Sequence, residues 1–402
     1  MGTNAEAFVL AATGGRRMRA EAMLAAEPEI EGDAWARLVL GRDWDGDPSA
    51  AGGPRGWAPL LYVCHSCFAS AKLAGELLAR GADPNAAFEN EYGSMSALYG
   101  AAGVVHSPEL TRVLLEAGAD PDDGESLYHA TEAESPECLR LLLGRGATTQ
   151  GANALPHALD DDRLEHVRLL LEAGADPNEG AFVAHAVRRG RGPEFLRLLA
   201  AHGADLDQPG GETWRGNVPL RTPYQHASLR GREDQAKTLL ELGASAAVDP
   251  DDLAIAALSR GEPPPAPLPS AMDPDRQEVI ILAALRGHLG AVCEAVGPNF
   301  RGVVGGSPEG PLLGHAAWVG DPEIVRELLA RGADPTARTD AAFDTPLAIA
   351  ALGSQFHACP GRDYVAIAEL LAAAGNDVEP RFLAVADGPL YGWLEERLGR
   401  TG

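Results

Sequence analysis

The chain has 402 residues, with 58 acidic side chains against 33 basic ones, so its formal net charge at neutral pH is −25. This surplus of negative charge disfavours binding to nucleic acid, because such binding relies on Lys and Arg side chains that neutralise phosphates. The sequence has no uncharged apolar run long enough to cross a membrane and no signal-peptide pattern at its start, so we expect a cytoplasmic protein.

Composition gives two further expectations. Only Lys72 and Lys237 are lysines, and this preference for Arg, together with abundant Ala and Gly, is typical of a GC-rich bacterial genome. The cysteines are irregularly spaced, so we expect reduced, mostly buried thiols at Cys64, Cys67, Cys138, Cys293 and Cys359.

In chain order, the predicted elements form a series of short helix pairs. Residues 7–30 are predicted to be a helix pair with a polar exterior, and residues 379–399 the corresponding C-terminal cap. Between them the phrase "ELLARGADPN" (76–85) recurs in altered form, each copy predicting a helix that ends at a Gly and passes into a turn. These glycines are Gly81, Gly118, Gly146, Gly174, Gly203, Gly243, Gly332 and Gly375, with a degenerate copy ending at Gly297.

A second short helix is predicted before each phrase, for example in 58–66, 222–231, 311–320 and 345–354. Helix pairs that recur about every 30 residues indicate a stacked repeat. The pattern resembles the ankyrin repeat family over nearly the whole chain. The Gly-Ala-Asp phrase carries the resemblance, and the family's Thr-Pro-Leu-His start remains only as Thr222-Pro223-Tyr224 and Thr345-Pro346-Leu347.

The resemblance implies an all-α, ankyrin-type helix-turn-helix solenoid of about ten or eleven helix pairs in a bacterial ankyrin repeat domain-containing protein. The repeats ending at Gly146, Gly174 and Gly203 are short, so we expect their β-hairpin fingers to be short or missing and their inner helices to be accessible. The longer loops 86–96 and 208–221 are predicted to project beside them.

Domain boundaries are predicted from a Pro-rich segment. We expect an N-terminal stack with its cap over 1–260, an interruption or linker over 261–276, and C-terminal repeats with a cap over 277–402. Two alternatives stay open here. Either the stack loses one outer helix and remains packed, or a flexible spacer separates two lobes.

Residues that follow the first Ala pair of a repeat point into the concave groove in ankyrin proteins, which makes them candidate partner-binding residues. Their charge changes sign along the chain: first Glu132, Asp160 and Asp161, then Arg188, Arg189, Arg230 and Arg286, and finally Trp318. A partner with an acidic segment is expected to contact the Arg-lined half. The alternative is ordinary solvated surface charge.

Loop residues suggest a second set of candidates. Trp57, Tyr92, Met95, Trp214 and Phe343 lie in or beside predicted turns, where they serve either as binding anchors on a rim or as packing over the loop base.

Histidines recur at one position, before the first Ala of the inner helix: His129, His157, His185, His226 and His315. Because neighbouring helix pairs lie about 10 Å apart, this column cannot hold one metal ion, and we expect a ladder of hydrogen bonds from each His to the turn of the next repeat. A pH-sensitive interface is the lesser alternative. The "CHSC" motif at 64–67 lacks a nearby second ligand pair, which favours packed thiols over zinc.

No phosphate-binding, nucleophile-elbow or metalloprotease motif is present, so we expect no enzyme, cofactor or metal. The sequence therefore predicts a monomeric protein–protein interaction scaffold that contacts neither nucleic acid nor membrane. The alternatives are a regulator or inhibitor of one enzyme and, less favoured, a small-molecule-binding or catalytic protein that uses the irregular region 262–310.

Overall fold

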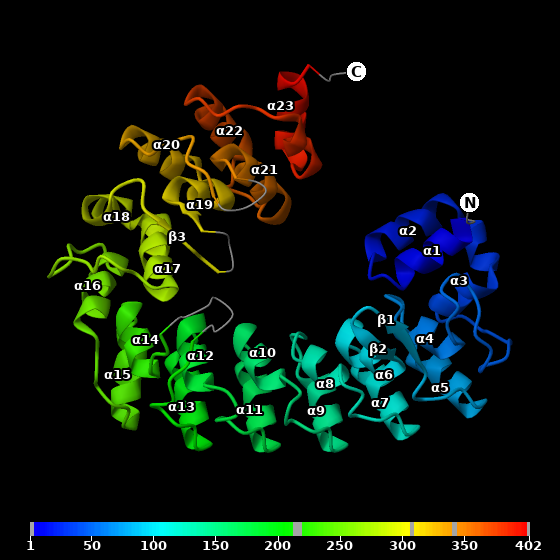
Figure 1. The fold of residues 1–402 in the computed structure, drawn as a ribbon. Helices are drawn as coiled ribbons and strands as arrows, with labels where there is room; N and C mark the ends of the chain where they lie inside the picture. The colour runs from blue at the N-terminus through cyan, green and yellow to red at the C-terminus, as the bar shows by residue number, and fades with distance from the viewer. Residues whose placement is uncertain (1–3, 212–218, 306–308, 340–343, 400–402) are drawn as a thin grey trace. The chain divides into compact units, whose positions relative to one another are not determined.

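The computed structural model describes residues 4–211, 219–305, 309–339 and 344–399. The chain forms two compact units, Met1–Asp205 and Leu206–Gly402, and each is a stack of short helices (Figure 1). The predicted interruption at 261–276 lies inside the second unit, and the domain boundaries drawn around it stay a prediction.

The first unit contains helices with one hairpin among its described residues. Its elements are α1 (Asn4–Ala12), α2 (Arg17–Ala26), η1 (Pro28–Gly32), α3 (Ala34–Val39), α4 (Pro59–Cys64), α5 (Ala71–Ala79), β1 (Ala87–Asn90), β2 (Gly93–Ser96), α6 (Ala97–Tyr99), η2 (Gly100–Val104), α7 (Pro108–Glu116), α8 (Ser126–His129), α9 (Glu137–Gly144), α10 (Ala154–Asp160), α11 (Leu164–Glu172), α12 (Phe182–Arg189) and α13 (Pro193–Ala201).

The second unit continues the same alternation. Its elements are α14 (Pro223–Leu229), α15 (Glu233–Leu242), α16 (Pro250–Ser259), α17 (Pro274–Ala283), η4 (Ala284–His288), α18 (Leu289–Val296), β3 (Arg301–Gly302), β4 (Gly310–Pro311), α19 (Leu312–Val319), α20 (Pro322–Ala330), α21 (Pro346–Phe356), α22 (Tyr364–Ala373), η5 (Pro380–Ala384) and α23 (Gly388–Arg397).

The recurring phrase closes the second helix of each pair, as predicted. At the end of α11, Gly174 has a φ of +96°, in the left-handed region that favours glycine. The Gly174 N–H donates to the Leu171 carbonyl, and the Ala175 N–H donates to the Leu170 carbonyl. These bonds satisfy carbonyls that the helix leaves without partners and direct the chain toward the next pair.

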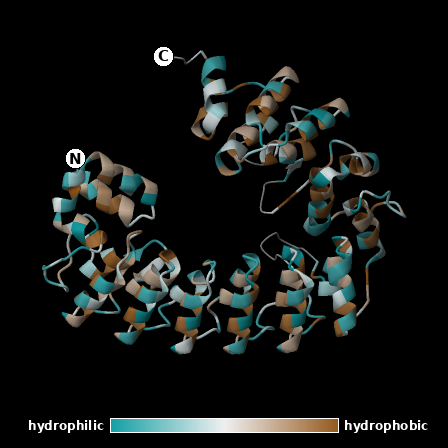
Figure 2. Cartoon of the chain, turned by 180° about the vertical axis from the view of Figure 1, so that it is seen from behind, coloured by the Kyte–Doolittle hydropathy of each residue, from teal (hydrophilic) through white to brown (hydrophobic). Residues whose placement is uncertain are grey.

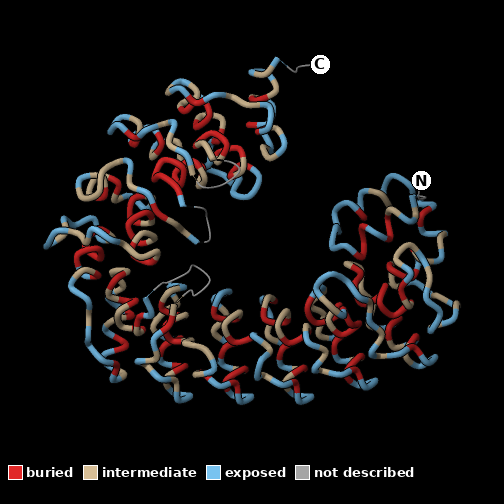
Figure 3. Tube along the Cα trace, viewed as in Figure 1, coloured by how far each residue is buried: buried red, intermediate tan, exposed pale blue. Residues whose placement is uncertain are grey.

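Apolar side chains hold neighbouring pairs together. One leucine occupies the same place in the second helix of successive pairs and is fully buried each time: Leu77, Leu114, Leu142, Leu170 and Leu199. Figure 2 shows hydrophobic residues along the helices, and Figure 3 shows that buried residues follow them while the turns are largely exposed. Burial of one such side chain contributes about 1.5–3 kcal/mol, which a helix pair gains only beside a neighbour.

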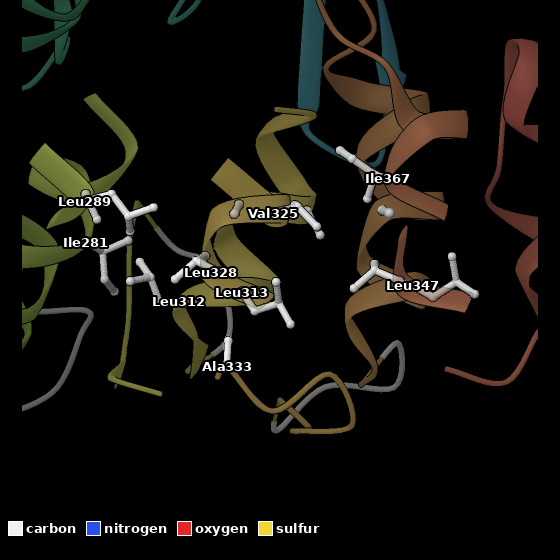
Figure 4. Close-up of a cluster of buried hydrophobic side chains, with 14 of the residues drawn as sticks. Ile281, Leu289, Leu312, Leu313, Val325, Leu328, Ala333, Leu347 and Ile367 are labelled. Atoms are coloured by element: carbon white, nitrogen blue, oxygen red, sulfur yellow. The ribbon is translucent and has the colours of Figure 1, made fainter. Parts of the chain in front are cut away.

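A cluster of buried side chains extends through the second unit. It runs from Leu229 of α14 to Leu394 of α23, and Figure 4 shows its middle, where Ile281 and Leu312 approach Leu328. The helices α19 and α21, and likewise α20 and α22, pack against each other, so the unit has the two rows expected of stacked pairs.

An Asn that follows Pro in the turn joins one pair to the next. The Asn178 side chain accepts a hydrogen bond from the Asp205 N–H (N···O 2.7 Å) and donates one to the Gly203 carbonyl (3.1 Å). The same two bonds recur from Asn85 to Asp120 and Gly118, and from Asn299 to Asp334 and Gly332. The Asn therefore links the turns of consecutive repeats.

Hairpins occur where the sequence predicted long loops. Strands β1 and β2 pair antiparallel, with Phe88 opposite Met95, and an antiparallel bridge joins Gly210 to Arg221. Residues 97–209, all of which are described, contain no strand. The prediction that the central repeats lack fingers is therefore confirmed, as is the all-α helix-turn-helix stack with atypical terminal helices. A further short antiparallel pairing joins β3 to β4.

The Pro-rich segment interrupts one helix row only. Helix α16 packs against α14 before it and α17 after it, so this row continues. Residues 260–273, all described, contain no helix, which leaves α16 without an outer partner.

Among the described residues, one helical stretch, Pro274–Val296, is long and apolar enough to cross a membrane by length and composition. Within it Gly287 has a φ of +107°, which breaks the stretch into α17 and α18. A span needs about 20 continuous helical residues, and these two helices have 10 and 8. The stretch is the helix pair of one repeat.

The Asn bridge can be tested at Asn178. Replacement with Ala removes both bonds, and we expect a loss of about 1 kcal/mol in the free energy of unfolding and faster hydrogen exchange at the Asp205 amide. The Asn178→Asp variant keeps the acceptor and is the matched control, in which the Asp205 amide should stay protected. Equal exchange at this amide in both variants would contradict the bridge.

Candidate functional site

Three first helices of the central repeats, α8, α10 and α12, present a polar surface that no hairpin covers. Helix α10 packs between α8 and α12, and each is followed by a short turn. We call the exposed side of these helices and turns the inner face. The candidates it carries are Glu132, Asp160, Asp161, Arg188 and Arg189, together with Tyr128 and the histidines His129, His157 and His185.

Aromatic rings follow one another across this face. The Tyr99 ring meets the His129 ring edge-on at 5.1 Å between centroids, and the Tyr128 ring stacks on His157 at 4.1 Å with 30° between the planes. Tyr128 also meets His129 edge-on at 4.8 Å. Both Tyr128 and His129 are half-buried, so the rings are held by packing but remain partly accessible.

Carboxylates surround these rings. Glu132 lies 2.7 Å from Nδ1 of His129, and Glu125 lies 3.3 Å from its Nε2. Burial raises the pKa of the Tyr128 hydroxyl, and the charges of four carboxylates raise it further: Glu132, Asp160, Asp161 and Glu125. The rings therefore lie in a strongly negative local field.

The negative field has a source in the sequence. Residues 113–139 contain no Lys or Arg but eight carboxylates: Glu116, Asp120, Asp122, Asp123, Glu125, Glu132, Glu134 and Glu137. The predicted change of sign then falls at α12. There Arg189 pairs with Asp160 at 2.6 Å and Arg191 pairs with Asp162 at 2.9 Å, while the Arg188 side chain is half-buried.

Clefts between successive turns border this face. One of 310 Å³ lies among Gly151, Asn153, Pro156, Asp176, Glu179 and Phe182. A second, of 330 Å³, lies one repeat earlier beside Asp122 and Leu127, and a third, of 250 Å³, beside Asp120 and Asp123. Clefts lined by acidic side chains therefore lie along the edge of the inner face.

In the second unit the predicted exposure of Arg230 is wrong. Its side chain is only 7% exposed, and its guanidinium donates to Asp275 at 3.2 Å and to Glu278 at 3.5 Å. The periodicity placed Arg230 correctly after α14, but α17 supplies carboxylates that the repeat pattern did not reveal. Arg286, by contrast, is exposed in η4, and Trp318 is half-buried beside Phe356.

Arg230 belongs to a buried ion network that sequence reasoning missed. The Arg221 guanidinium binds both oxygens of Asp252, at 2.8 and 3.1 Å, and reaches Asp273 at 2.8 Å. Arg276 donates to the same Asp252 at 2.8 Å. Three guanidinium groups thus face four buried or nearly buried carboxylates: Arg221, Arg230 and Arg276 against Asp252, Asp273, Asp275 and Glu278.

The network fastens α14, α16 and α17 to one another. Burial lowers the pKa of Arg221, but its hydrogen bonds to Asp252 and Asp273 outweigh burial and raise the pKa above its usual value. A signal was available in the sequence, because Asp-Pro-Asp occurs at both 249–251 and 273–275, where the first Asp caps a helix.

The histidine column is structural, but the expected direction of its bonds is wrong. His226 and His315 donate to the carbonyls of Gly210 and Gly302, in the loop before their own helix rather than in the next repeat. His157 pairs with Thr131 and His185 with Asp160, one repeat earlier.

The loop candidates differ in their exposure to solvent. Tyr92 is 79% exposed at the tip of the β1–β2 hairpin. Trp57 and Met95 are buried, and the Trp57 ring stacks on Phe88 at 4.1 Å, so for these two the packing alternative is the correct one. Trp214 and Phe343 lie outside the described residues.

The "CHSC" motif begins at the last residue of α4, in the first unit. Cys64 is fully buried, and burial raises the pKa of its thiol. The Nε2–H of His65 donates to the Ser96 carbonyl at 3.0 Å. Among the described residues, no group of three or more His, Cys, Asp and Glu side chains is placed to hold a metal ion.

Comparison with known proteins agrees with the repeat architecture. The model for ankyrin repeats in three copies matches residues 98–181, and the single ankyrin repeat model matches residues 311–340. No curated protein matches the chain.

Among solved structures, the human ASB11 ankyrin repeat domain is 19% identical, covers 60% of this chain and 99% of its own, and has a TM-score of 0.39. The ankyrin repeat domain of Bcl-3, a member of the IkappaB family, is 26% identical over 44% of this chain and 82% of its own (TM-score 0.37). An ankyrin repeat domain from Acinetobacter baumannii is 26% identical over 44% and 93% (TM-score 0.36).

The stacked pairs and their uncovered polar face define a helix-turn-helix repeat solenoid. With the repeat models matched in both units, the chain is an ankyrin repeat protein. Ankyrin repeats are, in general, protein–protein interaction modules.

The ion network predicts an uneven response to single substitutions. Asp252→Asn removes the buried carboxylate that Arg221 and Arg276 share, so we expect a loss of about 3 kcal/mol in the free energy of unfolding. Hydrogen exchange should rise in α14, α16 and α17. Glu262→Gln, in the exposed pair with Arg260, is the control and should cost less than about 1 kcal/mol. Similar losses in urea unfolding of both variants would show that the network adds nothing.

His65 predicts a pH dependence of stability. Burial lowers its pKa from 6.5 to about 4. The unfolded chain therefore binds a proton that the folded chain does not, and stability present above pH 6.5 is lost as the pH falls toward 4, by about 3 kcal/mol in total. In urea unfolding, His65→Gln should show a shallower loss than the wild type across this window. Parallel curves would contradict the assignment.

Proposed function

We propose that this ankyrin repeat protein is a non-catalytic scaffold that binds another protein through the inner face of its first unit. The turns and the β1–β2 hairpin, with Tyr92 at its tip, form the rim. The observation that carries the proposal is the uncovered stretch of α8, α10 and α12, where missing fingers leave ring and charged side chains accessible.

The rigidity of the face supports binding. The Tyr128 and His157 rings are stacked, and Asp160 is fixed by His185 and Arg189. Side chains that are already ordered lose little conformational entropy when a partner binds.

The second unit supports a different role. Arg230 occupies the position equivalent to the charged residues of the inner face, yet its charge is neutralised within the fold. We therefore place the contact surface in the first unit, and assign α14, α16 and α17 to stabilising the stack.

We further propose that the protein acts as a monomer in the cytoplasm and contacts neither nucleic acid nor membrane. All five cysteines are free thiols, as expected of a protein from a reducing compartment, and the net charge of −25 opposes contact with phosphates. A regulator or inhibitor of one specific enzyme would use the same face, with that enzyme as the partner.

Site-specific crosslinking tests the proposal. A photoreactive benzoylphenylalanine is placed at Asp161 or Arg189 on the inner face, and at Arg168 or Arg197 on the second helices α11 and α13 as matched exposed controls. After irradiation in lysate of the native cell, we expect one protein to be crosslinked from both inner positions and from neither control position, as identified by mass spectrometry.

Two results would contradict the proposal. One is capture of the same protein from the control positions alone, which would place the contact on the second helices. The other is the absence of any crosslinked protein from the inner positions while the variants remain folded by circular dichroism.

A further inference from the structure

If the inner face binds a protein, as proposed above, its charge indicates which kind of partner segment it binds. Near α8 the carboxylates Glu125, Glu132 and Asp161 outnumber the cations. Asp160 is matched by Arg189, and no basic side chain pairs with Asp161 among the described residues. A ligand that lies on this end of the face must bring positive charge to match it.

The aromatic rings of the inner face indicate which positively charged group fits there. Tyr128 is half-buried on a stacked ring pair, and a cation over such a ring gains about 0.5–2 kcal/mol from its π-electrons. An Arg guanidinium is planar, so it can stack on the ring while its N–H groups donate to the carboxylates on either side. A Lys ammonium is a point charge that cannot do both with the same geometry.

We propose that the inner face binds an extended, Arg-containing basic segment of a partner protein, with one guanidinium over the Tyr128 ring and in reach of Glu125 and Glu132, the carboxylates that also contact His129. At α12 the surplus of carboxylates ends, because Arg189 pairs with Asp160 there. The cationic part of the segment therefore lies over α8 and α10.

The size of the segment follows from the repeat spacing. Neighbouring pairs lie about 10 Å apart, so the distance from α8 to α12 is about 20 Å. An extended chain rises about 3.3 Å per residue, and about six or seven residues cover that distance.

The Pro-rich interruption and the buried ion network lie in the second unit, and the inner face is defined by α8, α10 and α12 of the first. The acidic segment expected from the sequence relied on a row of arginines that included Arg230, which is buried in that network. The structure therefore favours a basic partner segment over an acidic one.

Binding of defined peptides to the full-length protein tests the proposal. The probe is a fluorescein-labelled nine-residue peptide of alternating Gly and Arg, and the comparison peptides carry Lys or Glu in place of Arg. In fluorescence anisotropy at 0.15 M salt, where exposed charges are screened beyond about 8 Å, we expect the Arg peptide to bind more tightly than the Lys peptide and the Glu peptide not to bind.

Two triple variants with the same charge change separate a site from general attraction. Glu125→Gln/Glu132→Gln/Asp161→Asn alters the inner face, and Glu137→Gln/Glu165→Gln/Glu172→Gln alters exposed positions on α9 and α11. We expect Kd for the Arg peptide to rise about tenfold in the first and less than twofold in the second. Equal rises in both would overturn the proposal, because they would show attraction to the net charge alone.

The contribution of the Tyr128 ring to binding is tested separately. Tyr128→Phe keeps the aromatic face and should bind as the wild type does, whereas Tyr128→Ala should weaken binding about three- to tenfold, in proportion to the cation–π energy. Equal weakening in both variants would assign the contact to the hydroxyl and contradict the stacked guanidinium.

The peptide experiment and the crosslinking experiment test the basic segment and the scaffold separately, so either proposal can be wrong without the other. If inner-face crosslinks capture a protein whose crosslinked segment is not basic, or if the Glu peptide binds more tightly, the basic segment is wrong and the scaffold stands. If no protein is crosslinked from the inner face, the scaffold itself is wrong.

Discussion

No helix pair in this chain can bury its apolar stripe alone, and the rest of the structure follows from that constraint. The fully buried leucines at one place in successive pairs, such as Leu142, Leu170 and Leu199, are buried because a neighbouring pair covers them. The side-chain bridge from Asn178 to the next turn fixes the register of that stacking. Anything that does not disturb the apolar contact or the bridge is free to vary, which is why the central repeats can lose their fingers and keep their helices.

The missing outer helix after α16 shows a second way to satisfy the same constraint. Arg221, Arg276 and their carboxylate partners link α14, α16 and α17 beside the apolar cluster that continues through this region. Apolar packing is tolerant of shape, whereas a buried ion pair stabilises only when both partners are present with good geometry. This region of the second unit is therefore held by ion pairs with exacting geometry as well as by apolar packing, and single substitutions in the network should have large effects.

The sequence was sufficient for the parts of the fold that depend on local order along the chain. Helix ends at Gly174 and its equivalents, the absent fingers and the terminal caps all follow from turn chemistry and repeat length. The exposure of individual side chains was harder to predict, because a position in a repeat gives the side of the helix but does not give the residues packed against that side. Arg230 meets a carboxylate 45 residues away, and Trp57 meets Phe88 across a hairpin, and neither contact has a periodic signal. Of the predicted arginines, Arg230 is buried for this reason, whereas Arg189 and Arg286 are exposed, and partner binding by either half stays a prediction.

The two units thus use equivalent positions in different ways. In the second unit the charge of Arg230 is cancelled by Asp275 and Glu278 within the fold, so that position serves stability and has little left to offer a partner. In the first unit the turns after α8 and α10 carry more carboxylates than the fold neutralises, and the self-repulsion of these groups disfavours leaving the face uncovered. Binding of a cationic segment relieves that repulsion and uses rings that are already ordered. A surface that is costly to leave bare and rigid enough to need no rearrangement has the properties of a recognition site, which is the physical basis for locating recognition at Tyr128 and its surrounding carboxylates.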